Sequence, residues 1–232
     1  MPHNSAFAPP RGLVVASANP GKLREFRRLL AGLPFELTSL AELGLASPEE
    51  SGTTFLENAT LKARHAAQLS GLAAVADDSG LEVDALDGAP GLFSARYAGT
   101  QGDDAANNAK LMRELLGIPM LERRARYRCS VVFVSAAADL EPLVAEGAWE
   151  GFILEAPRGS GGFGYDPYFW LPELEVSAAE LAPEEKNRLS HRGKALRQLR
   201  TQLAAREQES PERTVREQTA REQTVREQTV RK

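Results

Sequence analysis

The sequence predicts an α/β fold built on a mixed β-sheet with helices on its faces. Short apolar runs alternate with capped helical segments over the first 70 residues, which is typical of βα units. Two long strand-like runs, 126–136 and 143–154, then flank a turn, as in a hairpin. Because βα units join parallel strands and hairpins join antiparallel ones, the two patterns together indicate a mixed sheet.

The individual elements are predicted from their apolar pattern and their caps. Asn19 as N-cap and Pro20 in the first turn begin a helix that extends to about residue 30. The capping box from Thr54 to Glu57 begins a second helix, which extends to about residue 69. The other expected elements are strands at 13–17, 35–40, 72–76 and 81–86, a loop at 87–99, and helices at 103–116 and from His191, capped by Ser190.

The composition is that of an ordinary globular chain and argues against several classes of protein. Of the 232 residues, 42% are hydrophobic and 26% are charged, which is enough for a sizeable core. The net charge of −4 argues against a nucleic acid or a membrane surface as partner. No apolar stretch has the length of a membrane span, and the N-terminus lacks the pattern of a signal peptide. The single cysteine, Cys129, lies in an apolar run, so we expect a buried, inert thiol and a cytoplasmic protein.

Three segments are expected along the chain. Residues 1–11 are rich in proline and small residues and are expected to be a flexible leader, and residues 12–204 are expected to form one folded domain. Residues 205–232 settle into a five-residue repeat of the form Thr-Val-Arg-Glu-Gln. Because a step of five residues turns a helix by about 500°, the repeated apolar side chains spiral around the axis and form no apolar face. We therefore expect this tail to be disordered or a frayed helix.

The segment 160–170 combines glycines, five aromatic rings and the carboxylate of Asp166. Glycines let a ligand approach the backbone and aromatic rings stack on bases, so the segment predicts a slot for a flat heterocycle. Residues 159–164 also match the G-x-G-x-x-G pattern of dinucleotide-binding folds. That interpretation requires a helix after the motif, and Pro167 and Pro172 argue against one. A glycine turn that leads into a buried aromatic strand is the structural alternative.

Residues 17–22, Ser-Ala-Asn-Pro-Gly-Lys, lie between the first predicted strand and the first predicted helix. A helix N-terminus offers free N–H groups and a partial positive charge, and Ser17, Asn19 and Lys22 add donors, so a phosphate would suit this place. The segment is not a Walker A loop, because Ala16 and Leu23 stand where that motif has Gly and Ser or Thr. An ordinary strand–cap–helix junction is the alternative.

Carboxylates are concentrated in two further places. Asp77 and Asp78 follow a predicted buried strand, where ligands of open α/β sheets gather, and a cation such as Mg²⁺ would offset their mutual repulsion. Asp78 is also a candidate to deprotonate an attacking water. Glu50, just before the second helix, is a candidate second metal ligand, and Lys62 on that helix is placed to reach a phosphate. Solvated side chains on an acidic turn are the alternative.

A cationic cluster surrounds the start of the last predicted helix, with Lys186, His191 and Arg192 as its candidate site residues. Cations are disfavoured at a helix N-terminus. Their presence there is therefore as consistent with an anionic or carbonyl-bearing ligand as with a structural role.

Together these segments resemble the inosine triphosphate pyrophosphatase family, hydrolases of deaminated purine nucleoside triphosphates such as dITP and XTP. The resemblance covers about residues 12–204 and depends on six segments in the family's order: 17–22, 53–64, 76–81, 88–97, 161–167 and 190–193. It implies an elongated fold with two lobes around a central cleft, and a homodimer. It also implies Mg²⁺-dependent cleavage between the α- and β-phosphates, which gives a monophosphate and pyrophosphate.

The resemblance implies a role for each candidate residue. The triphosphate would be held by Ser17, Ala18, Asn19, Pro20, Gly21 and Lys22, with help from Lys62, and Ser79 would lie at the sugar–phosphate end. Mg²⁺ would be held by Glu50 and Asp78, with Asp78 as the general base. The base slot would be formed by Phe163, Gly164, Tyr165 and Asp166 and closed by Lys186, His191 and Arg192. A donor such as Arg192 would bind the 6-keto oxygen of hypoxanthine or xanthine and discriminate against adenine.

One residue departs from the family pattern, because the family usually has Gly where this chain has Ala18. We expect phosphate binding there to be weakened or unchanged. Two alternatives to the main interpretation remain open at this point: a pyrophosphatase for modified pyrimidine nucleotides, and a nucleotide-binding module without catalysis.

Overall fold

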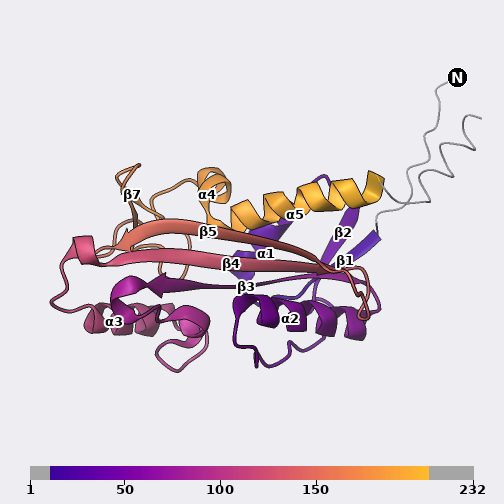
Figure 1. Ribbon diagram of the computed structural model, residues 1–232, viewed down its shortest axis with the longest axis horizontal. Helices are drawn as coiled ribbons and strands as arrows, with labels where there is room; N and C mark the ends of the chain where they lie inside the picture. The colour runs from indigo at the N-terminus through magenta and orange to yellow at the C-terminus, as the bar shows by residue number, and fades with distance from the viewer. Residues whose placement is uncertain (1–10, 209–232) are drawn as a thin grey trace, which may run out of the picture.

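The computed structural model describes residues 11–208, which form an elongated molecule around one seven-stranded sheet (Figure 1). The strand order is β2-β1-β3-β4-β5-β6-β7. β1 (Arg11–Val15) is parallel to its two neighbours, β2 (Phe35–Ser39) and β3 (Ala73–Val83). The rest of the sheet is antiparallel and consists of β4 (Arg124–Val134), β5 (Leu143–Ile153), β6 (Phe169–Leu171) and β7 (Val176–Ser177). The predicted mixed sheet is confirmed.

Helices cover both faces of the sheet (Figure 1). On one face, α2 (Phe55–Ser70) packs against β3 and β4 through a row of alanines, which lets the helix lie close to the strands. On the other face, α5 (His191–Gln208) packs against β4 and β5, and α1 (Pro20–Leu29) packs beside it. The shorter helical elements are η1 (Asp84–Leu86), η2 (Gly91–Arg96), α3 (Asp104–Glu114), η3 (Met120–Glu122) and α4 (Pro183–Leu189).

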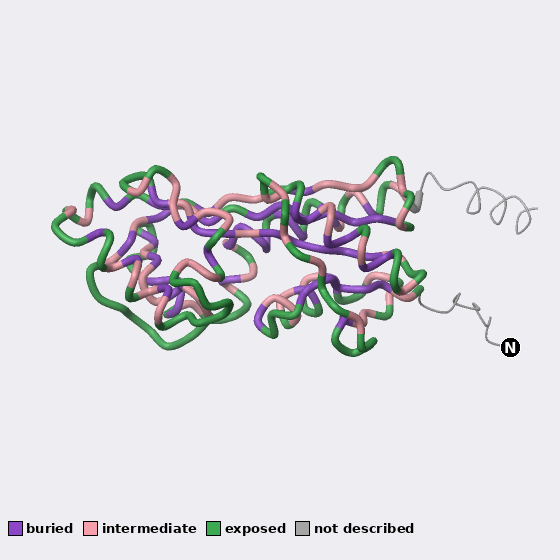
Figure 2. Tube along the Cα trace, turned by 90° about the horizontal axis from the view of Figure 1, so that it is seen from below, coloured by how far each residue is buried: buried purple, intermediate pink, exposed green. Residues whose placement is uncertain are grey.

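The molecule has two lobes that share the long strands. β3, β4 and β5 each have 11 residues and extend through both lobes, and buried residues follow them along the length of the molecule (Figure 2). In the first lobe, one apolar core lies between the sheet and the pair α1 and α5. A second apolar core lies between the sheet and α2. In the second lobe, a third core, which includes Leu111, Trp149 and Phe169, joins α3 to the far ends of the long strands. A ligand between the lobes would therefore lie on the long strands that connect them.

The prediction of two separate strands at 72–76 and 81–86 is wrong. Residues 73–83 form one strand, and β4 pairs with it from Ala74 to Val83. This continuous pairing satisfies the backbone of 77–80, where the sequence indicates a polar turn. Gly80 lies inside the strand because a Cβ there would lie 2.2 Å from the carbonyl oxygen of Gly91.

The segment after the glycine motif also differs from the prediction. In place of the aromatic strand that the structural alternative expects, residues 163–168 are mostly turns, and only Phe169–Leu171 forms a strand. Turns and β6, and not a helix, come directly after the motif, so the dinucleotide-binding interpretation is wrong. The short helix α4 was not predicted, although Pro183 at its first position and the two glutamates after it are typical of a helix start.

The predicted ends of the domain are described only in part. Arg11, the last residue of the expected leader, begins β1, and the first four residues of the expected tail continue α5 to Gln208. The remainder of the leader and of the tail lies outside the described residues. Within the described part of the chain, no helix is both long and apolar enough to cross a membrane.

Candidate functional site

A cavity of about 590 Å³ lies between the two lobes. Every candidate residue predicted from the sequence lines it except Pro20 and Gly21, which form the first turn of α1. We call its two ends the lysine end, with Lys22, Glu50, Lys62 and Asp78, and the aromatic end, with Tyr127, Phe163, Tyr165 and His191. Residues that are far apart in the sequence thus line one cavity.

The cavity exists because β1 is shorter than β3. The pairing of β1 with β3 ends at Val75, whereas β3 continues to Val83. Asp77 and Asp78 therefore lie beyond the end of β1, although they are in the middle of β3. The prediction that ligands gather at a strand's carboxyl end applies here to β1, and not to the strand that carries the aspartates.

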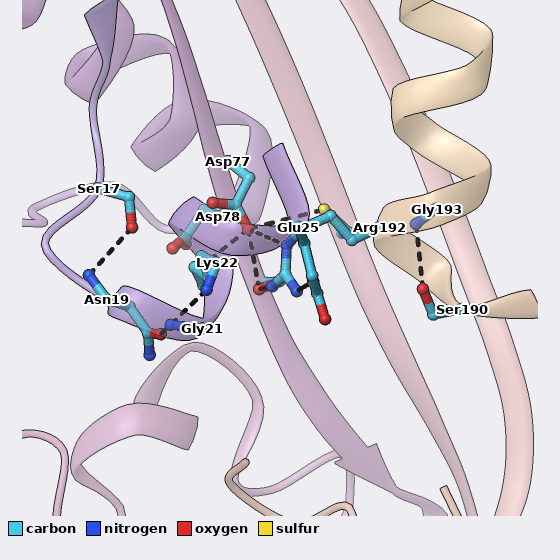
Figure 3. Close-up of polar contacts among 12 residues, drawn as sticks. Ser17, Asn19, Gly21, Lys22, Glu25, Asp77, Asp78, Ser190, Arg192 and Gly193 are labelled. Atoms are coloured by element: carbon cyan, nitrogen blue, oxygen red, sulfur yellow. Dashed lines mark hydrogen bonds and ion pairs between the residues drawn. The ribbon is translucent and has the colours of Figure 1, made fainter. Parts of the chain in front are cut away.

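The loop after β1 caps α1 with its own side chains. The Asn19 Oδ1 atom accepts hydrogen bonds from the backbone N–H groups of Gly21 (2.8 Å) and Lys22 (3.1 Å), and Ser17 Oγ accepts one from the N–H of Asn19 (Figure 3). Asn19 is thus the predicted N-cap. These bonds use N–H groups that the sequence analysis assigned to a phosphate, so the donors left for an anion here are chiefly side chains such as Lys22.

At the lysine end, Lys62 joins the two candidate metal ligands. Its Nζ lies 2.8 Å from Glu50 Oε1 and 2.8 Å from Asp78 Oδ1. The second oxygen of Asp78 accepts a hydrogen bond from Asn58 Nδ2 (3.2 Å), and the second oxygen of Glu50 is 2.9 Å from Arg96 Nη1. Each carboxylate is therefore fixed by two donors and has lone pairs left for a further ligand.

Burial and charge act in opposite directions on these carboxyl groups. Burial raises the pKa of Asp78, and Lys62 offsets only part of that effect. Burial would also raise the pKa of Glu50, but Lys62 and Arg96 outweigh it, so the pKa of Glu50 is lowered. Asp78 is thus the better proton acceptor of the two, and Glu50 the more firmly ionised.

The donor set at this end fits a magnesium ion that arrives with a polyphosphate. Within the described residues, no three His, Cys, Asp or Glu side chains are grouped so that they could hold a metal by themselves. Mg²⁺, however, is usually held by one or two carboxylates together with phosphate oxygens and water. Glu50 and Asp78, which share Lys62 as a neighbour, supply that number of carboxylates.

Asp77 faces away from Asp78 and is buried below the cavity. Successive side chains of a strand point to opposite faces, so Asp78 faces α2 whereas Asp77 faces α1 and α5. Asp77 Oδ2 is 2.9 Å from Lys22 Nζ and 3.0 Å from Arg192 Nε (Figure 3). Each aspartate thus has its own ion pairs, with Lys22 and Arg192 at Asp77 and Lys62 at Asp78. Despite burial, these cations hold the pKa of Asp77 far below its usual range.

The ion pairs continue from Asp77 toward the aromatic end. Arg192 also pairs with Glu25 of α1, Glu25 lies 3.6 Å from Lys186, and Lys186 pairs with Asp166. A connected series of charges, which includes residues of the cavity wall, therefore extends from Lys22 to Asp166.

At the aromatic end, Asp166 holds the glycine-rich turn in place. Its Oδ2 accepts hydrogen bonds from the N–H of Phe163 (2.7 Å) and from Lys186 Nζ. Gly162 has a φ of 73°, and a Cβ there would lie 2.1 Å from that oxygen, so the turn requires glycine. Because Asp166 is 3% exposed and already bonded, it supports the slot more than it offers an acceptor to a ligand.

The rings at this end form two layers. His191 stacks on Tyr127, with 4.7 Å between the ring centroids and 10° between the planes. The Lys186 ammonium lies over the Phe163 ring, with its Nζ 4.6 Å from the ring centroid. The Phe163 ring also packs against Gly21. Burial, and then Arg192 and Lys186, hold the pKa of His191 well below 6.5, so the imidazole is neutral near neutral pH.

Several site residues were not assigned a role by the sequence analysis. They are Glu25, Asp77, Arg96, Asp104 and Tyr127, which line the cavity or pair with residues that do. Asp104 Oδ2 accepts a hydrogen bond from the N–H of Gly164 (2.7 Å) and so ties α3 to the slot. Arg96 belongs to a segment that contributed to the family resemblance, and that membership was the only sign in the sequence of a role for it.

The predicted burial of the Cys129 thiol is confirmed, and burial raises its pKa.

The comparison with family models and curated proteins gives one consistent result. The model of the Ham1 family matches residues 13–202. A dITP/XTP pyrophosphatase of Methylococcus capsulatus is 55% identical over 195 residues, which cover 84% of this chain and 97% of that protein. A dITP/XTP pyrophosphatase of Thioalkalivibrio sulfidiphilus is 53% identical over 194 residues, which cover 84% of this chain and 99% of that protein.

Solved structures agree with the sequence comparison. A HAM1 protein from Coxiella burnetii is similar with a TM-score of 0.77 and 46% identity, over 84% of this chain and 99% of that one. The Ham1 protein of Staphylococcus aureus is similar with a TM-score of 0.75 and 38% identity, over 84% of this chain and all of that one (100%).

Proposed function

The chain belongs to the Ham1 family, and from this premise we propose that it is a dITP/XTP pyrophosphatase that cleaves deaminated purine nucleoside triphosphates to the monophosphate and pyrophosphate. The observation that carries the proposal is one continuous cavity with lysines and carboxylates at one end and stacked rings at the other. A triphosphate fits the first environment and a purine base fits the second.

The lysine end supplies the charges that phosphate hydrolysis requires. We propose that Lys22 and Lys62 neutralise phosphate oxygens, with Ser17 and Asn19 positioning them and Ser79 near the sugar. Phosphoryl transfer depends mainly on positioning and charge stabilisation, which fixed lysines provide. The first turn of α1, with Ala18, Pro20 and Gly21, shapes the backbone beside them.

Asp78 is the proposed general base. Its carboxylate would take a proton from the attacking water while the bond between the α- and β-phosphates breaks and pyrophosphate leaves. The raised pKa of Asp78 favours that role, because a more basic carboxylate accepts a proton more readily. Glu50 and Asp78 would hold Mg²⁺, which, when bound, neutralises charge on the phosphates.

The aromatic end is proposed to inspect the base. Phe163 and Tyr165 would stack on it, Gly164 would give it access to the backbone, and Asp166 and Lys186 would hold the turn in position. Arg192 uses three of its five N–H donors for Asp77, Glu25 and Ser79, so it retains donors for a 6-keto oxygen. The neutral imidazole of His191 lines the cavity together with Arg192. Adenine has an amino group at position 6 and would leave such donors unpaired, at a cost of about 1–3 kcal/mol.

Product analysis tests the proposed function. The protein is incubated with Mg²⁺ and ITP, dITP, XTP, ATP, GTP or dUTP, and the products are separated. We expect IMP and pyrophosphate from ITP, with ATP turned over about 10- to 200-fold less efficiently. Release of IDP and orthophosphate, or equal turnover of ATP, would contradict the proposal. Faster turnover of dUTP would favour a pyrimidine nucleotide pyrophosphatase, and tight ITP binding without turnover would favour a binding module.

The setting and assembly of the protein are also proposals. A buried free thiol suits a reducing compartment, so we propose that the protein acts in the cytoplasm. The family resemblance supports a homodimer, which light scattering of the purified chain would test. A monomer mass at micromolar concentration would contradict it.

A further inference from the structure

Asp77 is a buried carboxylate shared by two cations that line the cavity. Its side chain is fully buried, and its Oδ2 accepts from Nζ of Lys22 and from Nε of Arg192 (Figure 3). Ser79 Oγ also donates to this oxygen, at 3.2 Å. The other oxygen, Oδ1, is buried and has no hydrogen-bond partner among the described residues.

The surrounding bonds leave these two cations little freedom. The Nη1 and Nη2 atoms of Arg192 are bonded to Glu25 and to Ser79 Oγ, so all three guanidinium nitrogens have a partner. Lys22 projects from the first turn of α1, whereas Arg192 projects from the first turn of α5. Asp77 is therefore the point at which the helix beside the phosphate loop and the helix beside the base slot meet through one carboxylate.

From this geometry we propose that Asp77 is a positioning residue that couples phosphate recognition by Lys22 to base recognition by Arg192. The inference rests on the proposed function and adds a residue to which no contact with the substrate is assigned. The cavity wall includes Lys22 and Arg192 but not Asp77. Asp77 therefore acts through its two partners.

The coupling follows from competition for one oxygen in a poorly solvated place. Charges interact strongly there, and Oδ1 makes no bond that would compensate for a loss at Oδ2. If Arg192 is removed, the carboxylate attracts Lys22 alone, and Lys22 is less available to a phosphate. The loss of ITP affinity on removing Arg192 thus includes part of the affinity that Lys22 contributes. Removal of both cations should cost less than the two single losses combined.

A double-mutant cycle tests the proposal. ITP binding is measured by calorimetry in EDTA, so that no turnover occurs, for the full-length unsubstituted chain, Lys22→Met, Arg192→Met and the double variant. We expect the combined loss of affinity to be smaller than the product of the single losses by about fivefold or more. The same four proteins are then made with Asp77→Asn, where we expect the losses to multiply to within about twofold.

The matched control is Asp139→Asn. The side chain of Asp139 is only 5% exposed and lies 3.8 Å from an arginine, Arg206, but it is in the turn between β4 and β5. The non-additivity should persist in that background, whereas a general effect of losing a buried carboxylate would remove it there too and overturn the proposal. Equal non-additivity with and without Asp77→Asn would also overturn it. If Asp77→Asn does not fold, the cycle in the original chain decides, because additive losses there overturn the proposal.

The failure of this inference differs from the failure of the proposed function. Measurable ITP binding with additive losses contradicts only the role of Asp77. Absence of ITP binding by the unsubstituted chain contradicts the proposed function and this inference together.

Discussion

Gly21→Ala is a change whose effects on stability and on activity should separate. Gly21 is buried in the first turn of α1, and a Cβ there would lie 2.7 and 2.9 Å from two ring carbons of Phe163. Because carbon atoms in contact are usually about 3.5–4.0 Å apart, the ring must move by about 1 Å. The change therefore acts on the base slot from the opposite side of the cavity.

The expected change in stability is small because two terms oppose each other. Alanine in place of glycine stabilises a helix by about 1 kcal/mol, and less at the first turn. Overpacking costs about 1–3 kcal/mol, at the low end where the displaced group can move. Phe163 is only partly buried and borders the cavity, so it can move. We expect the free energy of unfolding, measured with urea, to change by less than about 1 kcal/mol.

The expected change in activity is larger. Stacking of a base on an aromatic ring contributes about 1–3 kcal/mol, so displacement of Phe163 should lower kcat/KM for ITP by about 5- to 150-fold. Pyrophosphate release over a range of ITP concentrations measures this ratio. Phe163→Ala is the matched background, since the alanine at position 21 then has no ring to displace. An equal loss of kcat/KM in that background would refute the reasoning and assign the effect to the phosphate loop.

Three further predictions concern single side chains of the site. Asp78→Asn should lower kcat by about 10²- to 10⁴-fold and leave the affinity for ITP, measured in EDTA, within a few-fold; near-normal turnover would remove Asp78 from the role of base. Arg96→Gln should raise the Mg²⁺ concentration for half-maximal activity by about 10- to 100-fold, and Arg96→Lys by less, because Arg96 fixes Glu50; an unchanged Mg²⁺ dependence would contradict that link. The unfolded chain binds a proton at His191 below pH 6.5 and the folded chain does not, so stability should fall by up to about 1.4 kcal/mol per pH unit as the pH drops below 6.5. Urea unfolding of His191→Gln should lack that part of the pH dependence, and an identical slope would show that the imidazole is not the cause.

Local signals predicted much of the fold. Asn19 and Thr54 cap the helices that they were expected to cap, because an N-cap bonds N–H groups two or three residues away. The family resemblance, which depends on six short segments, is confirmed by the Ham1 match over residues 13–202. The caps could be predicted because each capping side chain and the N–H groups that it bonds lie close together in the sequence.

The site's ion pairs depend on contacts that no local pattern encodes. Arg192 reaches Asp77 across 115 positions, and Arg96 reaches Glu50 across 46. The wrong end assigned to β3 has the same origin, because residues 77–80 are polar or glycine and become a strand only through their pairing with β4. The roles of Asp77 and Arg96 were therefore beyond prediction from the sequence, although both residues lie within the segments that define the family.

The opposite orientations of Asp77 and Asp78 have a consequence for how this chain can change in length. β4 fixes the register of β3 on both sides of the two aspartates, from Ala74 paired with Val134 to Val83 paired with Ala125. An insertion or deletion of one residue just before Asp77 would exchange the two faces of the sheet, so that Asp78 would point toward α1 and α5 and Asp77 toward α2. The hairpin turn at 135–142 can be lengthened without such an exchange, because it lies outside the paired residues. In β3, alternate positions face different helices, so only substitutions leave both aspartates in their orientations.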